Sequence, residues 1–115
     1  MNFSEYQRLA KVTKKQWEAK EGDLADCGLG LTGEAGEVAD MLKKHLSGSK
    51  LLDTEGKEKL KYEIGDVMWY IASLCDCMGF DMDDIAQMNI DKLKKRHGDK
   101  YSGYGKRDNE NKWKK

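Results

Sequence analysis

Two pairs of acidic side chains, each three residues apart, lie in segments with helical periodicity. Glu34 and Glu37 form the first pair, and Glu63 and Asp66 form the second. Side chains spaced by three or four residues point from the same face of an α-helix. Both pairs share a face with apolar residues, which is an unusual place for surface acids. We therefore expect four carboxylates to point toward one interior.

The four carboxylates need a compensating charge if they converge. An ionised carboxylate buried without a partner is costly, and neighbouring carboxylates repel one another. Oxygen ligands without thiolates or an obvious histidine favour Mg²⁺ or Mn²⁺ over zinc or copper. The alternative is that these acids form surface salt bridges, because 37% of all residues are charged. The pattern predicts a magnesium site built from Glu34, Glu37, Glu63 and Asp66.

Helical periodicity runs through most of the chain, so we expect an all-α fold similar to a four-helix bundle. Proline is absent, and no segment alternates in the manner of a β-strand. A first helix is predicted from its cap at Ser4 to residues 20–22. The other predicted helices cover at least 32–46, with a stop at Ser47-Gly48-Ser49, then 55–78, with a stop at Gly79, and from 81–84 to Arg96.

Three glycines, Gly28, Gly30 and Gly33, precede the first acidic pair. Segment 24–33 is interpreted either as a loop or as a helix whose backbone allows a close approach. The spacing also matches a dinucleotide-binding fingerprint, but that motif must follow a β-strand, and residues 21–27 do not form one. A di-iron carboxylate bundle is disfavoured because it uses Glu-x-x-His pairs. The glycines therefore predict local backbone geometry and not a cofactor loop.

The segments that carry the acidic pairs resemble the MazG-type all-α nucleotide pyrophosphohydrolases. The resemblance covers roughly residues 24–98, through GLTGEAGEVADMLKKHL and KYEIGDVMWYIASLCDCMGFDMDDIAQMNIDKLKKRHG. This family is marked by Glu-x-x-Glu on one helix and Glu-x-x-Asp on the next. The resemblance implies Mg-dependent hydrolysis of (deoxy)nucleoside triphosphates to a nucleoside monophosphate and pyrophosphate, as in house-cleaning of the nucleotide pool. Glu37 and Glu63 are then the expected catalytic residues. Which carboxylate acts as the general base is left open, and Glu37 is the first choice because of its position in the stripe between Glu34 and Met41.

A polar face on the predicted fourth helix follows the second acidic pair. Asn89, Lys92 and Arg96 are spaced by three and four residues, so they share one side of a helix. Arg can bind two phosphate oxygens at once, and Lys acts as a point charge. The alternative is an ordinary solvated basic face. Together with the acids, these three residues are expected to bind the triphosphate.

Aromatic residues offer a further way to contact a nucleotide. Trp17, Trp69 and Tyr70 could stack on a base, although aromatic residues at helical spacing more often belong to a core. We expect Trp69 to be a core residue.

The charges divide the chain into an acidic body and a basic end. Residues 1–91 carry 11 Lys/Arg against 18 Asp/Glu, and residues 92–115 carry 10 against 3. We expect one catalytic domain at 1–98 and a flexible basic tail at 99–115. The tail interleaves Tyr101, Tyr104 and Trp113 with lysines, so the alternative function is a non-enzymatic helical module that binds nucleic acid. That alternative leaves the inward acids unexplained, and nucleic acid is the less favoured partner.

Composition also bears on assembly and location. Only 38% of the residues are hydrophobic, so a homodimer or homotetramer formed through helix faces is expected to complete the core. No apolar run approaches the roughly 18 residues of a membrane span, and the N-terminus does not resemble a signal peptide. A cytoplasmic protein without a membrane partner is expected. Cys27, Cys75 and Cys77 contain no Cys-x-x-Cys motif and are predicted to fill the core as free thiols.

Overall fold

The computed structural model describes residues 1–101, and every regular element in them is helical. The all-α prediction is therefore confirmed for the described part of the chain. The chain divides into two compact units, of which the first is Met1–Met82 and the second begins at Asp83. The helices are α1 (Phe3–Ala10), α2 (Lys20–Ser47), α3 (Thr54–Met78), α4 (Met82–Arg96) and α5 (Gly98–Tyr101), with a 3₁₀ turn (Lys11–Thr13) after α1.

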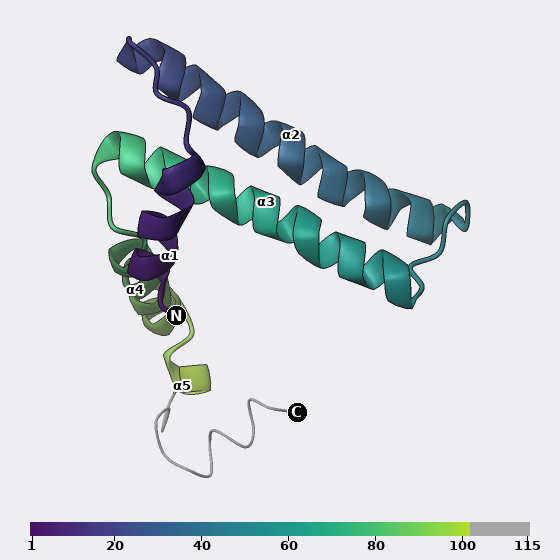
Figure 1. The fold of residues 1–115 in the computed structure, drawn as a ribbon. Helices are drawn as coiled ribbons and strands as arrows, with labels where there is room; N and C mark the ends of the chain where they lie inside the picture. The colour runs from purple at the N-terminus through teal and green to yellow at the C-terminus, as the bar shows by residue number, and fades with distance from the viewer. Residues whose placement is uncertain (102–115) are drawn as a thin grey trace. The chain divides into compact units, whose positions relative to one another are not determined.

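Helices α2 and α3 form a long antiparallel hairpin that dominates the first unit (Figure 1). Helix α2 ends as predicted, because Gly48 adopts a φ of 79°, a left-handed conformation that costs glycine little. Asp53 Oδ1 accepts a hydrogen bond of 2.7 Å from the Gly56 N–H and caps α3, which ends before Gly79 at a φ of 71°. Segment 24–33 is helical, so its glycines lie inside α2 and the loop interpretation is excluded.

The connection between α2 and α3 is tied to the last turn of α2. His45 Nδ1 accepts a hydrogen bond of 2.9 Å from the Leu52 N–H. The Ser47 hydroxyl donates to the Lys44 carbonyl at 3.1 Å, and the Ser47 and Ser49 hydroxyls lie 3.0 Å apart. His45 therefore has a structural partner in the connection.

The prediction of one long first helix from Ser4 to residues 20–22 is wrong. Asn2 is the cap of α1, since its Oδ1 accepts a hydrogen bond of 2.8 Å from the Glu5 N–H. The helix gives way to the 3₁₀ turn, and the backbone at Lys14 is extended, with a φ of −72° and a ψ of 132°. This break lets the Lys14 side chain turn inward. A continuous helix would have prevented that contact.

Lys14 joins the N-terminal segment to both long helices. Its side chain is only 5% exposed, and its Nζ lies 3.3 Å from an oxygen of Asp23 in α2 and 3.1 Å from Oδ2 of Asp76 in α3. It also donates to the Ser73 carbonyl at 3.2 Å. A buried ammonium group is tolerated only when its charge and its N–H groups are matched, and these contacts match them.

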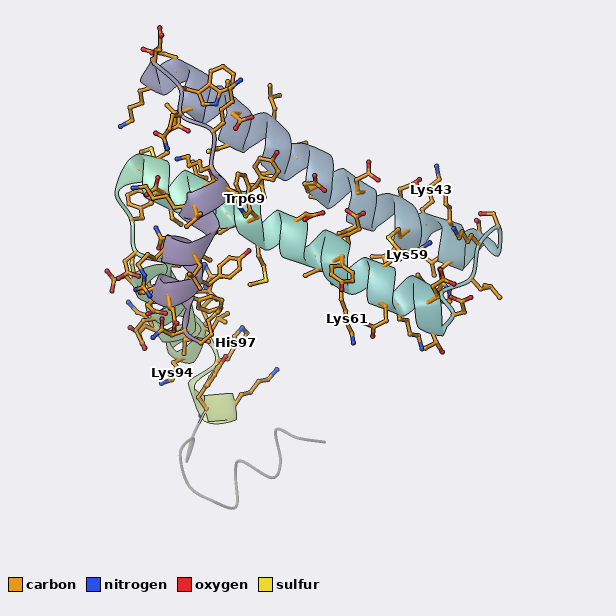
Figure 2. The ribbon with its side chains drawn as sticks, in the orientation of Figure 1. Lys43, Lys59, Lys61, Trp69, Lys94 and His97 are labelled. Carbon is orange, nitrogen blue, oxygen red and sulfur yellow. The ribbon has the colours of Figure 1, made fainter. Side chains whose placement is uncertain are left out.

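Helix α1 crosses α3 and covers part of it (Figure 1). The Trp69 indole N–H donates to the Ala10 carbonyl at 3.1 Å and to Thr13 Oγ1 at 3.0 Å, so this side chain is anchored beneath the end of α1 (Figure 2). Tyr6 and Ala10 pack against a small core of α3 residues and the start of α4, formed by Ala72, Cys75 and Met82. Cys27 and Cys75 are buried and all three cysteines are free, as predicted.

An apolar stripe of α3 does not form the face that meets α2; it runs through Leu60, Ile64, Val67, Ile71, Leu74 and Met78. Ile64, Ile71 and Met78 remain 46%, 38% and 41% exposed, although the pattern suggested an internal core. The positions of α3 that meet α2 each come one residue before a residue of this stripe. Neighbouring positions on a helix differ by about 100°, so the two sets point in different directions. The positions that meet α2 are mostly polar or small. The hairpin therefore packs through a polar face, and an apolar face is left partly uncovered.

In the second unit, α4 agrees with the predicted fourth helix. The His97 N–H still donates to the Leu93 carbonyl at 2.9 Å, and the short helix α5 follows at once. Residues 99–101, predicted to begin a flexible tail, are therefore helical. The rest of that tail, 102–115, lies outside the described residues. Among the described helices, none is long and apolar enough to cross a membrane.

Candidate metal centre

The antiparallel contact between α2 and α3 fixes which side chains meet. Cys27 Sγ lies 3.3 Å from Ser73 Oγ, and both residues are buried. Three residues further along α2, and three residues back along α3, Gly30 meets the ring of Tyr70. These two pairs define the register in which α2 and α3 face each other. The same register extends along the hairpin to the acidic residues.

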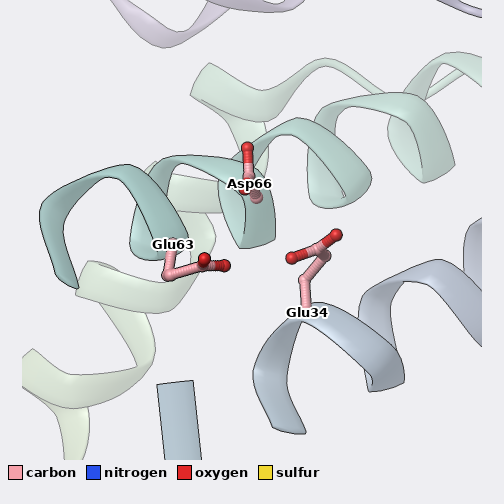
Figure 3. Close-up of side chains that lie close together, drawn as sticks. All are labelled: Glu34, Glu63 and Asp66. Carbon is pink, nitrogen blue, oxygen red and sulfur yellow. The ribbon is translucent and has the colours of Figure 1, made fainter. Parts of the chain in front are cut away.

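Continuing in this register brings three of the four predicted acids together. Glu34 in α2 points toward Glu63 and Asp66 in α3 (Figure 3). One oxygen from each carboxylate can be chosen so that all three lie within 4.8 Å of one another. Glu34 and Glu63 are half-buried, whereas Asp66 is exposed. The cluster thus lies on the polar face where the two helices meet.

The negative charges of the three carboxylates repel one another, and this affects the pKa of Glu34. Partial burial raises the pKa of Glu34, and the charges of Asp66 and Glu63, together with a hydrogen bond to Glu63, raise it further. Burial and then the charge of Asp66 raise the pKa of Tyr6, so this field reaches α1. The protein alone supplies no cation that neutralises the cluster among the contacts of its described residues.

The donor set fits a hard divalent cation. Carboxylate oxygens are the ligands preferred by Mg²⁺, Mn²⁺ and Ca²⁺, and the cluster offers neither thiolate nor imidazole. Two ligands of one ion with bonds of about 2.1 Å are at most about 4.2 Å apart, so only a small closing movement is needed. Glu34, Glu63 and Asp66 are the residues that could hold it.

Glu37, the fourth predicted acid, is placed differently. It is exposed and lies outside the group of three, one turn beyond Glu34 on α2. The register puts it opposite Glu63, and its charge adds to the raised pKa of Glu34. Its assignment as a ligand and a general base stays a prediction.

The predicted phosphate-binding residues all belong to the second unit. Asn89, Lys92 and Arg96 lie on α4 and are exposed. Their common helix face is confirmed, because α4 is continuous across them. Their role toward the triphosphate stays a prediction.

A cavity of about 360 Å³ adjoins the connection between α2 and α3. Met41 and Lys59 line it, one helical turn beyond Glu37 and Glu63 respectively, and Lys44 and Lys50 add positive charge. The lining therefore combines apolar side chains with three lysines and two acids, Asp53 and Glu55. Lys44 is paired with Asp40 and Lys59 with Glu55. The spacing of the acidic pairs and of the α4 residues gave no signal for this cavity.

The pH dependence of stability should reveal the Glu34 carboxyl. Because the pKa of Glu34 is raised in the folded state, the folded protein holds this proton more tightly than the unfolded chain does. That contribution to stability is present below the ordinary value of about 4.3 and is lost as the pH rises through the raised value. In thermal unfolding without divalent cations, the wild type should lose stability relative to Glu34→Gln as the pH rises from about 4 to 7.

The matched control is Glu58→Gln, since Glu58 is paired with Lys61 at 2.7 Å on the exposed side of α3. A difference between wild type and Glu34→Gln that stays constant with pH would contradict the raised pKa.

Comparison with known proteins agrees with the geometry. The MazG nucleotide pyrophosphohydrolase domain matches residues 25–100, which is more than half of the chain. The Gene 37 protein of Mycobacterium phage L5 is 39% identical over 69 residues, covering 59% of this chain and 60% of that protein, so the chain spans less than two thirds of that relative. No solved structure matches the chain. With its two acidic pairs on α2 and α3, the chain belongs to the MazG nucleotide pyrophosphohydrolase family.

Proposed function

We propose that this protein hydrolyses (deoxy)nucleoside triphosphates to a nucleoside monophosphate and pyrophosphate, with Mg²⁺ as its cofactor and Mn²⁺ as a substitute. The convergence of Glu34, Glu63 and Asp66 within 4.8 Å carries the proposal. The family supports the reaction, since its members are nucleotide pyrophosphohydrolases. Removal of unwanted triphosphates from the nucleotide pool is the role that follows.

Each part of the site has a distinct task in this reaction. Glu34, Glu63 and Asp66 hold the cation, with Glu37 completing the set. When bound, the cation stabilises negative charge on phosphate oxygens and makes a bound water more acidic. The carboxylate of Glu37, which is exposed and opposite Glu63, accepts the proton of the water that attacks the α-phosphorus.

Room and charge for the substrate are found beside the acids. The cavity of about 360 Å³ is within the range of about 300–1,000 Å³ usual for small-molecule sites. Lys44, Lys50 and Lys59 outnumber Asp53 and Glu55 in its lining, which leaves a small positive balance for an anionic ligand. Asn89, Lys92 and Arg96 of α4 supply further donors to the phosphates.

The first prediction of this function concerns the acids. Glu37→Gln or Glu63→Gln should remove nearly all pyrophosphate release while leaving the helical content unchanged, because each substitution removes an oxygen ligand or the base. A panel of triphosphates assayed for pyrophosphate, with circular dichroism alongside, provides the measurement and identifies the preferred substrate. Glu58→Gln is the control, since Glu58 pairs with Lys61 at 2.7 Å on the exposed side of α3. Full activity in excess chelator would refute the proposal.

The second prediction concerns the basic face of α4. Lys92→Ala and Arg96→Ala should each reduce kcat/KM by an amount equivalent to about 2 kcal/mol, the loss expected for a charge-assisted phosphate contact. Cation affinity should hardly change. Lys95→Ala, on a neighbouring side of the same helix, is the control. Values within twofold of wild type for both variants would show that this face only meets solvent.

We also propose that the protein acts as a homodimer or homotetramer. Leu29, Leu46 and Tyr62 are 75%, 85% and 77% exposed on the hairpin, in addition to the uncovered stripe of α3. Apolar area of this kind usually marks an interface. Sedimentation at about micromolar concentration should give at least twice the monomer mass, and a stable monomer would exclude this assembly.

A further inference from the structure

The ring of Tyr70 occupies a position that no side chain at residue 30 could share. A Cβ atom built on Gly30 would lie 2.0 Å from Tyr70 Cε1 and 2.3 Å from Cζ, far inside van der Waals contact. Gly30 lies inside α2, where glycine favours the helix less than alanine does. Its lack of a side chain therefore serves the close approach of Tyr70.

This contact is one helical turn from the acidic cluster on both helices. Gly30 precedes Glu34 by four residues, and Tyr70 follows Asp66 by four residues, so each pair shares a helix face. On the other side lie Cys27 and Ser73, which are buried. The Tyr70 ring thus separates a closely packed part of the hairpin from the carboxylates.

The ring has little freedom to move aside. Trp69 contacts it edge to face, with ring centroids 5.0 Å apart and planes at 84°. Trp69 is itself held by hydrogen bonds to Ala10 and Thr13. A larger residue at position 30 would therefore push α2 and α3 apart, because the distance between packed helices depends on the side chains at their contact.

The separation of the helices determines whether the carboxylates can share an ion. Their oxygens lie within 4.8 Å of one another, and Mg²⁺ requires bonds of about 2.0–2.1 Å in nearly ideal octahedral geometry. An outward movement of the helices would lengthen these separations further beyond the roughly 4.2 Å that two ligands of one Mg²⁺ ion can span, so Glu34 would meet an ion held by Glu63 and Asp66 less readily.

We propose that Tyr70, seated against Gly30, is a positioning residue that sets the spacing of α2 and α3 so that Glu34, Glu63 and Asp66 can bind one divalent cation. The inference rests on the proposed metal-dependent function. The ring supplies the effect by its thickness, so the hydroxyl group is dispensable for cation binding.

The test measures Mn²⁺ affinity directly, through free Mn²⁺ detected by electron paramagnetic resonance during titration of the chelator-treated full chain. Gly30→Ala should bind Mn²⁺ at least tenfold more weakly than wild type. Gly28→Ala is the matched control, since it gains the same helix propensity and an added Cβ there meets nothing within 4 Å. Tyr70→Phe, which keeps the ring, should bind as wild type does.

A second substitution distinguishes positioning from general damage. Tyr70→Leu removes the ring and should weaken Mn²⁺ binding, but Gly30→Ala added to Tyr70→Leu should cause no further loss, because the clash is gone. Losses that add in the double variant would show that residues 30 and 70 do not act through one shared contact. Melting temperatures and circular dichroism establish that each variant is folded during titration, and Tyr70→Leu decides the matter if Gly30→Ala does not fold.

The outcomes separate the two proposals. If the wild type binds no Mn²⁺, the proposed function fails, and this inference fails with it. If the wild type binds Mn²⁺ but Gly30→Ala equals Gly28→Ala, or Tyr70→Leu equals wild type, only the positioning role is overturned.

Discussion

The mutual repulsion of Glu34, Glu63 and Asp66 is the constraint on which the rest of this structure depends. Carboxylates with oxygens within 4.8 Å of one another repel, and partial burial together with the charges of Asp66 and Glu63 raises the pKa of Glu34. The opposing force comes from the part of the hairpin beyond Tyr70, where Cys27 and Ser73 are buried in contact. The acids thus have the packed part of the hairpin on one side, and on the other side the cavity lined by Met41 and Lys59 begins one helical turn beyond Glu37 and Glu63.

The N-terminal segment reinforces the packed part. Lys14 binds Asp23 of α2 and Asp76 of α3 at once, so an ammonium group joins the two long helices away from the acidic cluster. The Trp69 indole N–H donates to the Ala10 carbonyl at the end of α1, and the Trp69 ring contacts the Tyr70 ring edge to face. A chain of contacts therefore runs from the N-terminal segment to Tyr70, one helical turn from the acidic cluster. Few side chains are fully buried, and Ile64, Ile71 and Met78 on the apolar side of α3 stay partly exposed.

Local sequence signals were sufficient for most elements but not for how they pack. The ends of α2 and α3 followed from Gly48 and Gly79, whose positive φ angles only glycine adopts easily. The convergence of three acids followed from spacing, because both pairs had to face the same neighbour. The break after α1 could not be foreseen, since it depends on the distant partners of Lys14. The face of α3 that meets α2 was also misjudged, because the apolar stripe was assumed to point inward within one chain.

The register of the hairpin has a consequence for how this chain can change in length during evolution. The connection between α2 and α3 is held mainly by its own hydrogen bonds, such as that from the Leu52 N–H to His45, so an insertion there leaves the facing pairs in place. One residue inserted between Gly30 and Glu34 would instead rotate Glu34 about the axis of α2 by about 100° relative to the contact between Gly30 and Tyr70. Deletions and insertions in homologous chains should therefore accumulate in the connection. The four-residue steps from Gly30 to Glu34 and from Asp66 to Tyr70 should keep their length.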